Sequence, residues 1–165
     1  MIGRFSKQNL VSSKMVKLIE ENQVKHYLKV VEVAIEHNSK FLIIKRPEGK
    51  HAGGLLSFPG GKVEEIDEHN EWDILRLAAK REIYEEVGLE LEDNLDYITS
   101  NYFVDSHGIH VIDTIFHCKI DKTPLNISAS EREVPEYYWM TTEETNSANN
   151  SPEWLKRYIQ YITNK

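Results

Sequence analysis

The sequence predicts an α/β (α+β) fold in which helices cover a mixed sheet, and three observations predict it. Segments with strand composition and segments with helical periodicity follow one another in the order strands, helix, strands, helix. One long segment, residues 73–87, carries apolar residues at helical spacing, so it can lie against a sheet. The length of 165 residues fits one domain with a single hydrophobic core.

The N-terminal segment is predicted to be an appendage to that domain. Residues 12–23 have the pattern of a short amphipathic helix. The apolar residues that recur at helical spacing there are Met15, Leu18 and Ile19. We therefore expect residues 1–24 to form an N-terminal helical appendage and residues 25–165 to form the main domain. A partner-binding arm is the alternative interpretation of the appendage.

The first half of the domain is predicted to contain a hairpin and a loop before its main helix. Residues 27–35 and 41–45 are rich in β-branched and apolar side chains, and turn residues separate them. Residues 46–57 contain Pro47, Gly49, Gly53 and Gly54, which predict a loop. A short extended piece over residues 58–63 surrounds a tight glycine turn, and the polar residues after it are expected to be irregular.

The helix over residues 73–87 is the strongest single prediction. Its apolar stripe consists of Leu75, Ala79, Ile83 and Val87. Asp73 stands near its N-terminus, where a carboxylate suits the helix dipole. Gly88 follows its last turn, where a left-handed residue is often needed.

The second half of the domain is predicted to contain three strands and a final helix. The expected strands cover residues 97–104, 109–120 and 134–140. Thr141 follows the last of them as a helix cap, with Glu144 in the first turn. Ser151 and Pro152 open the last helix.

Charge and composition restrict the partners. The formal net charge is −7, which disfavours binding to a nucleic acid polymer because Lys and Arg dominate phosphate neutralisation. A small phosphorylated metabolite that binds together with a cation is compatible with this charge. Cys118 is the only cysteine, so neither an intrachain disulfide nor a zinc cluster of the cysteine type is expected.

The apolar segments of the sequence bear on the location of the protein, and its edge strands bear on its assembly. The N-terminal residues lack an apolar run long enough for a signal peptide, and no segment has the ~20 apolar residues of a transmembrane helix. We therefore expect a cytoplasmic protein with no membrane partner. Exposed edge strands and the N-terminal arm make a homodimer a reasonable expectation.

Three carboxylates on one helical turn are the most informative chemical feature. Glu82, Glu85 and Glu86 lie within a ~100° arc of the helix and repel one another. A solvated surface with Arg81 bridging to Glu85 is one explanation, and such surfaces are common. However, these carboxylates stand in the last two turns, where the helix dipole disfavours anions. A hard cation such as Mg²⁺ or Mn²⁺, together with the turn at Gly60–Gly61, explains this placement better.

These residues together resemble the Nudix hydrolase family. The family box reads Gly-x5-Glu-x7-Arg-Glu-U-x-Glu-Glu-x-Gly-U, where U is a bulky aliphatic residue. Its second half matches fully over residues 81–89, and Phe58 to Glu64 is similar to the usual segment that precedes the box helix. The resemblance implies a Nudix-like α/β/α sandwich with a mixed sheet, in which the box forms a loop-helix-loop.

The resemblance also implies the activity and the site. It implies a metal-dependent pyrophosphohydrolase that cleaves the P–O–P bond of a nucleoside diphosphate linked to another group. Carried over by position, the metal ligands are Gly61, Glu82, Glu85 and Glu86. The catalytic residues are the same three glutamates and Arg81, which would orient a glutamate by charge-assisted hydrogen bonds. The cofactor is Mg²⁺ or Mn²⁺.

The first half of the box departs from the family pattern. Gly61 and Arg81 are 20 positions apart where the box expects 14, so about six residues are inserted. Counting back from Arg81 puts Asp73 in the place of the first box glutamate, and counting forward from Gly61 puts Asp67 there. With the insertion placed in residues 64–72, Asp73 is the preferred candidate and Glu71 the next.

Other residues are candidates for completing the site. Glu131 or Glu133 could add a late glutamate to the metal ligands. The expected phosphate-binding residues are Lys45, Arg46 and Lys62, although plain solvent exposure would explain them equally. Tyr102, Phe103 and His107 could stack on a base, but core or edge positions account for them more simply.

The substrate stays open between several classes. A nucleoside triphosphate is favoured, and coenzyme A, nucleotide-sugar and dinucleotide substrates are alternatives. The main rival from another class is a non-catalytic Nudix module that senses a nucleotide. That rival is weakened because the helix keeps all of its carboxylates.

Overall fold

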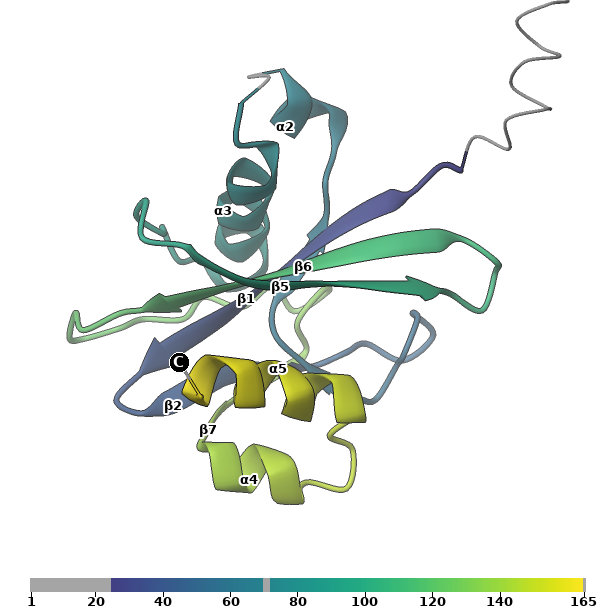
Figure 1. Cartoon of the computed structure of the whole chain (residues 1–165). Helices are drawn as coiled ribbons and strands as arrows, with labels where there is room; N and C mark the ends of the chain where they lie inside the picture. Colours follow the sequence, from purple (N-terminus) through teal and green to yellow (C-terminus); the bar gives the residue numbers. More distant parts are fainter. Residues whose placement is uncertain (1–24, 70–71, 165) are drawn as a thin grey trace, which may run out of the picture.

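The computed structural model describes residues 25–69 and 72–164, and these residues form a sheet with helices on both faces (Figure 1). The predicted helix over residues 12–23 and the candidate Glu71 lie outside the described residues. In the described part, every helix is too short or too polar to cross a membrane.

One mixed sheet forms the centre of the molecule. Its strands are β1 (Leu28–His37), β2 (Lys40–Lys45), β3 (Leu56–Ser57), β4 (Gly60–Lys62), β5 (Asp96–Val104), β6 (His110–Lys119) and β7 (Glu136–Met140). The main path runs β3-β2-β1-β6-β5, while β4 pairs with β1 and β7 pairs with β2. β1 and β6 run parallel and the other pairs are antiparallel. The predicted mixed sheet is therefore confirmed.

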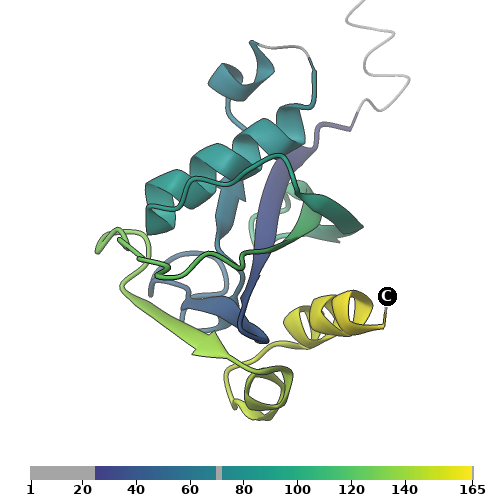
Figure 2. The same cartoon turned by 90° about the vertical axis from the view of Figure 1, so that its left-hand side faces the viewer.

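Helices lie on both faces of this sheet. They are α2 (Glu65–Glu68), α3 (Ile74–Val87), α4 (Thr142–Ser147) and α5 (Glu153–Thr163). α3 crosses one face, and α5 covers the opposite face with α4 beside it (Figures 1 and 2). This arrangement confirms the predicted sandwich.

The side chains of β1 point alternately to the two faces of the sheet, which explains why helices cover both faces. Val31, Val33 and Ile35 are fully buried in the cluster that includes α3, whereas Ala34 belongs to the cluster that includes α5. Successive strand residues point to opposite faces, so an apolar strand of this kind must be covered twice. Ile83 of α3 is also fully buried. Burying a side chain of this size contributes roughly 1.5–3 kcal/mol.

Both ends of α3 follow the sequence closely. Ile83 and Val87 of the predicted stripe are fully buried, and Leu75 packs against the same cluster as a partly buried residue. Gly88 ends the helix with φ 70° and donates its N–H to the Tyr84 carbonyl at 3.0 Å, which confirms the left-handed residue. Asp73 caps the other end with φ 54°.

Two short elements were not predicted. α2 falls in the segment expected to be irregular, and β3 falls in the expected loop over residues 46–57. Each is too short to show a periodic apolar pattern, because α2 spans four residues and β3 two. The predicted cap at Thr141 is confirmed, since its hydroxyl accepts from the Glu144 N–H at 3.2 Å.

Candidate active site

A cavity of about 860 Å³ is lined by residues of α3, of α5 and of the sheet between them. Its lining on the α3 side includes Glu82, Glu85 and Glu86, which we call the glutamate turn, together with Gly60 and Gly61. On the α5 side it includes Trp154 and Tyr158. The structure therefore brings the glutamates and the glycine turn to one hollow, as the sequence predicts.

The glycine turn has no room for side chains. A Cβ on Gly60 would stand 2.0 Å from the Val31 carbonyl oxygen, because β4 pairs with β1 at this point. A Cβ on Gly61 would stand 2.4 Å from Glu82 Oε2. The bare backbone thus allows the carboxylate of Glu82 to approach the turn, and the Gly60 N–H donates to Glu86 Oε2 at 2.9 Å.

The three glutamates differ in their surroundings. Glu82 and Glu86 are buried, whereas half of the Glu85 side chain is exposed. Burial raises the pKa of Glu86 to about 8; the hydrogen bond from Gly60 opposes this rise, and the carboxylates of Glu82 and Glu133 add to it. Burial also raises the pKa of Glu82, and its hydrogen bond from Arg81 opposes that rise. Burial therefore disfavours the charged form of both carboxyl groups, and a bound cation would stabilise that form.

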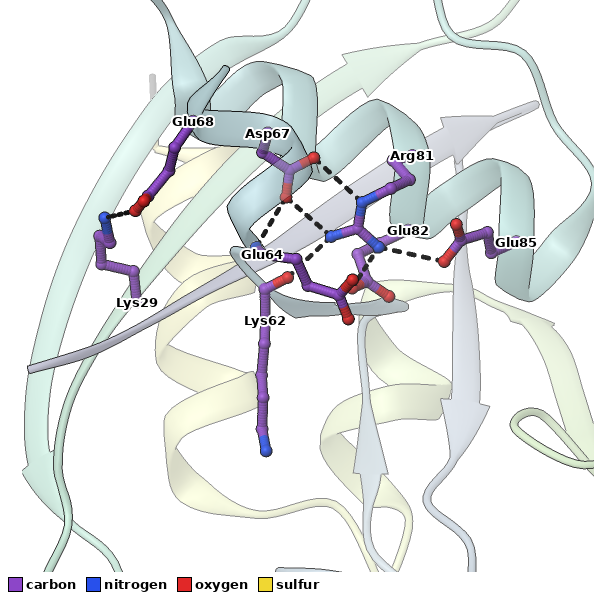
Figure 3. Close-up of polar contacts among 8 residues, drawn as sticks. All are labelled: Lys29, Lys62, Glu64, Asp67, Glu68, Arg81, Glu82 and Glu85. Carbon is purple, nitrogen blue, oxygen red and sulfur yellow. Dashed lines mark hydrogen bonds and ion pairs between the residues drawn. The ribbon is translucent and has the colours of Figure 1, made fainter. Parts of the chain in front are cut away.

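Arg81 holds the glutamate turn in place through five hydrogen bonds. Its Nε and Nη2 donate to the two oxygens of Asp67 at 3.0 and 2.9 Å. Nη2 also donates to the Lys62 carbonyl at 2.9 Å, and Nη1 donates to Glu82 and Glu85 at 2.9 and 3.0 Å. Figure 3 shows the guanidinium at the centre of these acceptors, with the Lys62 side chain extending away from it. We call this arrangement the Arg81 clamp.

The expectation that Asp73 replaces the first box glutamate is wrong. Asp73 caps α3 and pairs with Arg76 at 3.0 Å, while Asp67 makes the two-pronged contact with Arg81. The side chain of Asp67 is only 4% exposed, and its hydrogen bond from Arg81 lowers the pKa of this carboxyl. The inserted residues therefore follow Asp67, and α2 presents its carboxylate to the clamp.

The other sequence candidates divide between the cavity and its surroundings. Arg46, Lys62 and Glu133 line the cavity, while Glu131 is exposed outside that lining. Lys45 needs a correction, because its ammonium group pairs with Glu136 of β7 at 2.8 Å and the residue does not line the cavity. Strand alternation explains the split, since adjacent residues at the end of β2 point in different directions.

Sequence reasoning missed two further carboxylates in this cavity. Glu32 on β1 and Asp113 on β6 are 6% and 4% exposed, and both belong to the lining. Burial raises the pKa of both groups, that of Asp113 to about 6. The available signal was an acidic residue within an otherwise apolar strand segment, because acidic residues are almost never fully buried without a partner.

A divalent cation fits the donor chemistry of the glutamate turn. Within residues 25–69 and 72–164, no three acidic, histidine or cysteine side chains form a ready-made metal cluster, and the Glu85 carboxylate is hydrogen-bonded to Arg81. Both buried carboxylates nevertheless adjoin the glycine turn, since Glu82 lies beside Gly61 and Glu86 accepts from the Gly60 N–H. Oxygen donors of this kind suit Mg²⁺ or Mn²⁺, which also coordinate substrate phosphate and water.

Comparisons with known proteins find a matching family model and a related enzyme. Residues 26–161 match the family model described as the NUDIX domain. The CTP pyrophosphohydrolase of Escherichia coli (strain K12) is 34% identical over 90 residues, which cover 54% of this chain and 57% of that protein. The match thus spans little more than half the length of that relative.

Solved structures share the fold. The MutT protein from Methanosarcina mazei Go1 superimposes with a TM-score of 0.68 at 22% identity, covering 85% of this chain and 96% of that one. A bifunctional NMN adenylyltransferase/ADP ribose pyrophosphatase from Francisella tularensis, solved with AMP and a Mn ion, gives 0.62 at 20% identity, covering 94% of this chain and 45% of that one.

Proposed function

The chain belongs to the Nudix family, and from that premise we propose that it is a metal-dependent pyrophosphohydrolase acting on a nucleoside triphosphate or a related nucleotide. The observation that carries this proposal is the placement of Glu82 and Glu86 beside the Gly60–Gly61 turn, inside a cavity large enough for a nucleotide. The name of the curated relative, a CTP pyrophosphohydrolase, supports a nucleoside triphosphate as substrate.

The proposed reaction is the attack of water on a phosphorus atom. A new P–O bond forms to the water oxygen, the bridging P–O bond breaks, and the leaving phosphate carries away the electron pair. The proton of the water passes to a glutamate of the cavity, for which Glu86 and Glu133 are the candidates. A bound Mg²⁺ or Mn²⁺ would supply positive charge to the phosphate oxygens and lower the pKa of the attacking water.

Each residue of the site has a proposed task. Glu82, Glu85 and Glu86 hold the cation, with the Gly61 carbonyl as a neutral ligand. Arg81 is a positioning residue, because its hydrogen bonds fix Glu82 and Glu85. Arg46 and Lys62 are two of the cations of the cavity lining, which also includes Lys50, and we assign to these two the phosphates of the substrate.

A substrate panel read with and without metal tests this function. The panel contains nucleoside triphosphates, nucleotide sugars, dinucleotides and coenzyme A, and phosphorus NMR shows which P–O–P bond breaks. We expect hydrolysis of a nucleoside triphosphate in Mg²⁺ or Mn²⁺ that stops on addition of EDTA and returns with excess metal. Turnover that survives chelation would refute the metal assignment. Tight nucleotide binding with no hydrolysis on the panel would favour a nucleotide-sensing module.

A further inference from the structure

Two buried carboxylate oxygens in the cavity have no hydrogen-bond partner among the described residues. They are Glu32 Oε2 and Asp113 Oδ1. Both side chains line the cavity and are more than nine-tenths buried. Leaving a buried acceptor unpaired destabilises the fold, so polar atoms of this kind are rare in folded proteins. Their presence in a cavity indicates that a ligand supplies the missing donors.

Sheet register places the two carboxylates on the same face. Asp113 of β6 stands opposite Val30 of β1, and Glu32 follows two residues later on that strand. Residues two apart on a strand share a face, so both carboxylates face the α5 side of the sheet. Glu32 is also the register partner of Gly60. Glu32 therefore adjoins the glycine turn at which we place the cation.

A hydrogen-bonded chain fixes the orientation of Asp113. The Asn101 amide donates to the Tyr158 hydroxyl at 3.5 Å, and that hydroxyl donates to Asp113 Oδ2 at 3.1 Å. The second oxygen, Oδ1, is left to accept from a ligand. Tyr158 comes from α5 and Asn101 from β5, so three elements hold this acceptor in position.

The surrounding side chains suit a flat, neutral ring. Phe103 and Trp154 line the cavity together with aliphatic residues of β1 and β6. Aromatic and apolar walls with a few placed polar groups are typical of sites for organic ligands. Burial raises the pKa of Glu32 and of Asp113, and the charge of Arg46 opposes both increases. Arg46 already supplies positive charge near the two carboxylates, so we assign neutral N–H donors to their unpaired oxygens.

We propose that Glu32 and Asp113 read the nucleobase of the substrate and select bases that carry an exocyclic amino group, as cytosine and adenine do. The amino N–H groups would donate to Glu32 Oε2 and Asp113 Oδ1 while the phosphates reach the glutamate turn. Uracil and hypoxanthine carry an oxo group at the same position. This oxygen is a hydrogen-bond acceptor, so it cannot donate to either carboxylate oxygen. This assignment rests on the proposed nucleotide hydrolysis and specifies its substrate class.

The test compares nucleotides that differ only in this group. We expect kcat/KM to be at least about 10-fold higher for CTP than for UTP, or for ATP than for ITP, because a site built to bind a donor rejects an analogue without it. Isothermal titration with cytidine and uridine 5′-monophosphate measures the same preference without any reaction. Equal kcat/KM within both triphosphate pairs would overturn the base assignment while leaving the hydrolase intact.

Variants assign the preference to these carboxylates. Asp113→Asn replaces an acceptor by an amide that can donate to an oxo group, so the preference for the amino base should fall at least about 10-fold. Glu32→Gln should act in the same direction and serves as the second variant if the first is poorly folded. Glu36→Gln is the matched control, because Glu36 lies on the same strand outside the cavity lining and should leave the ratio unchanged.

The two assays separate the possible failures. A protein that prefers cytidine monophosphate to uridine monophosphate but hydrolyses neither triphosphate would support the base assignment and refute the hydrolase. A wild-type preference that persists in folded Asp113→Asn and Glu32→Gln variants, with melting temperatures like the wild type, would overturn the assignment of that preference to these carboxylates.

Discussion

The two arginines of the site are used in opposite ways. Arg81 donates five hydrogen bonds to Asp67, Lys62 and the glutamate turn, and its side chain is only 17% exposed. Arg46 donates through Nε to the His51 carbonyl at 2.9 Å, and no other hydrogen bond of its side chain occurs within the described residues. One guanidinium is therefore fully engaged with protein, while the other retains donors that face the cavity.

This difference assigns a structural role to Arg81 and a substrate-binding role to Arg46. Arg81 can position the glutamates but has no donor to offer a substrate, because a guanidinium has five N–H groups and all have acceptors. Arg46 is close enough to oppose the burial-driven rise in the pKa of Glu32, Glu86 and Asp113. We therefore expect changes at Arg81 to affect stability and turnover together, and changes at Arg46 to affect substrate affinity.

The largest expected effect belongs to Glu86. Replacing it by glutamine should lower kcat about 10²–10³-fold, the size typical of removing one electrostatic contact to a transition state. Stability should change little, because burial raises the pKa of Glu86 to about 8 and glutamine has nearly the shape of the protonated side chain. Metal-dependent phosphate release and chemical unfolding measure the two quantities. Glu90→Gln, an exposed neighbour on the same chain segment, should behave like the wild type.

Arg81→Lys should combine a loss of stability with a loss of activity. A lysine cannot make the two-pronged contact with Asp67, so we expect unfolding free energy to fall by about 2–4 kcal/mol. The activity should fall about 10-fold or more, because Glu82 and Glu85 lose a shared donor. Urea denaturation and steady-state kinetics provide the readouts. Wild-type stability in this variant would show that the clamp is dispensable.

Exchanging Asp67 or Asp73 for asparagine compares the buried and the exposed aspartate. Asp67→Asn should cost about 1–3 kcal/mol because Asp67 is buried and paired, whereas Asp73→Asn should cost under about 0.5 kcal/mol. The pKa of Asp67 is lowered in the folded protein, so its contribution is present above the unfolded pKa of about 4 and is lost as the pH falls through the folded value. The stability difference between wild type and Asp67→Asn should therefore shrink below pH 4. Equal costs for both variants would contradict the assignment of Asp67 to the box position.

The smallest expected effect distinguishes Arg46 from its neighbour Lys45. Arg46→Gln should raise KM about 10-fold with a similar melting temperature, since one charge-assisted contact to phosphate contributes roughly 1.5–3 kcal/mol at most. Lys45→Gln should leave KM within about twofold, because Lys45 pairs with Glu136 away from the cavity. A larger KM effect at Lys45 than at Arg46 would reverse the binding assignment.

The fold was predictable where long apolar patterns dictate it. β1, β6 and α3 each carry a long apolar pattern, and the structure contains all three close to the predicted ranges. α2 was missed because four residues, three of them acidic, are too few to carry a periodic signal. Its position depends on Asp67 reaching Arg81, a contact between residues 14 positions apart that no local pattern reveals.

The site was predictable where spacing along one helix determines it. Glu82, Glu85 and Glu86 share a helical arc, and the structure places all three at one cavity. The burial of Glu32 and Asp113 depends on α5 packing against their face of the sheet. This packing joins segments far apart in the sequence, so no local pattern predicts it. The separate directions of Lys45 and Arg46 likewise depend on where β2 ends.

The closeness of Gly60 to strand β1 has a consequence for engineering. A methyl group at this position would overlap the Val31 carbonyl, so all nineteen alternatives should be depleted from a random library selected for activity. Directed evolution toward new substrates would have to leave this turn untouched.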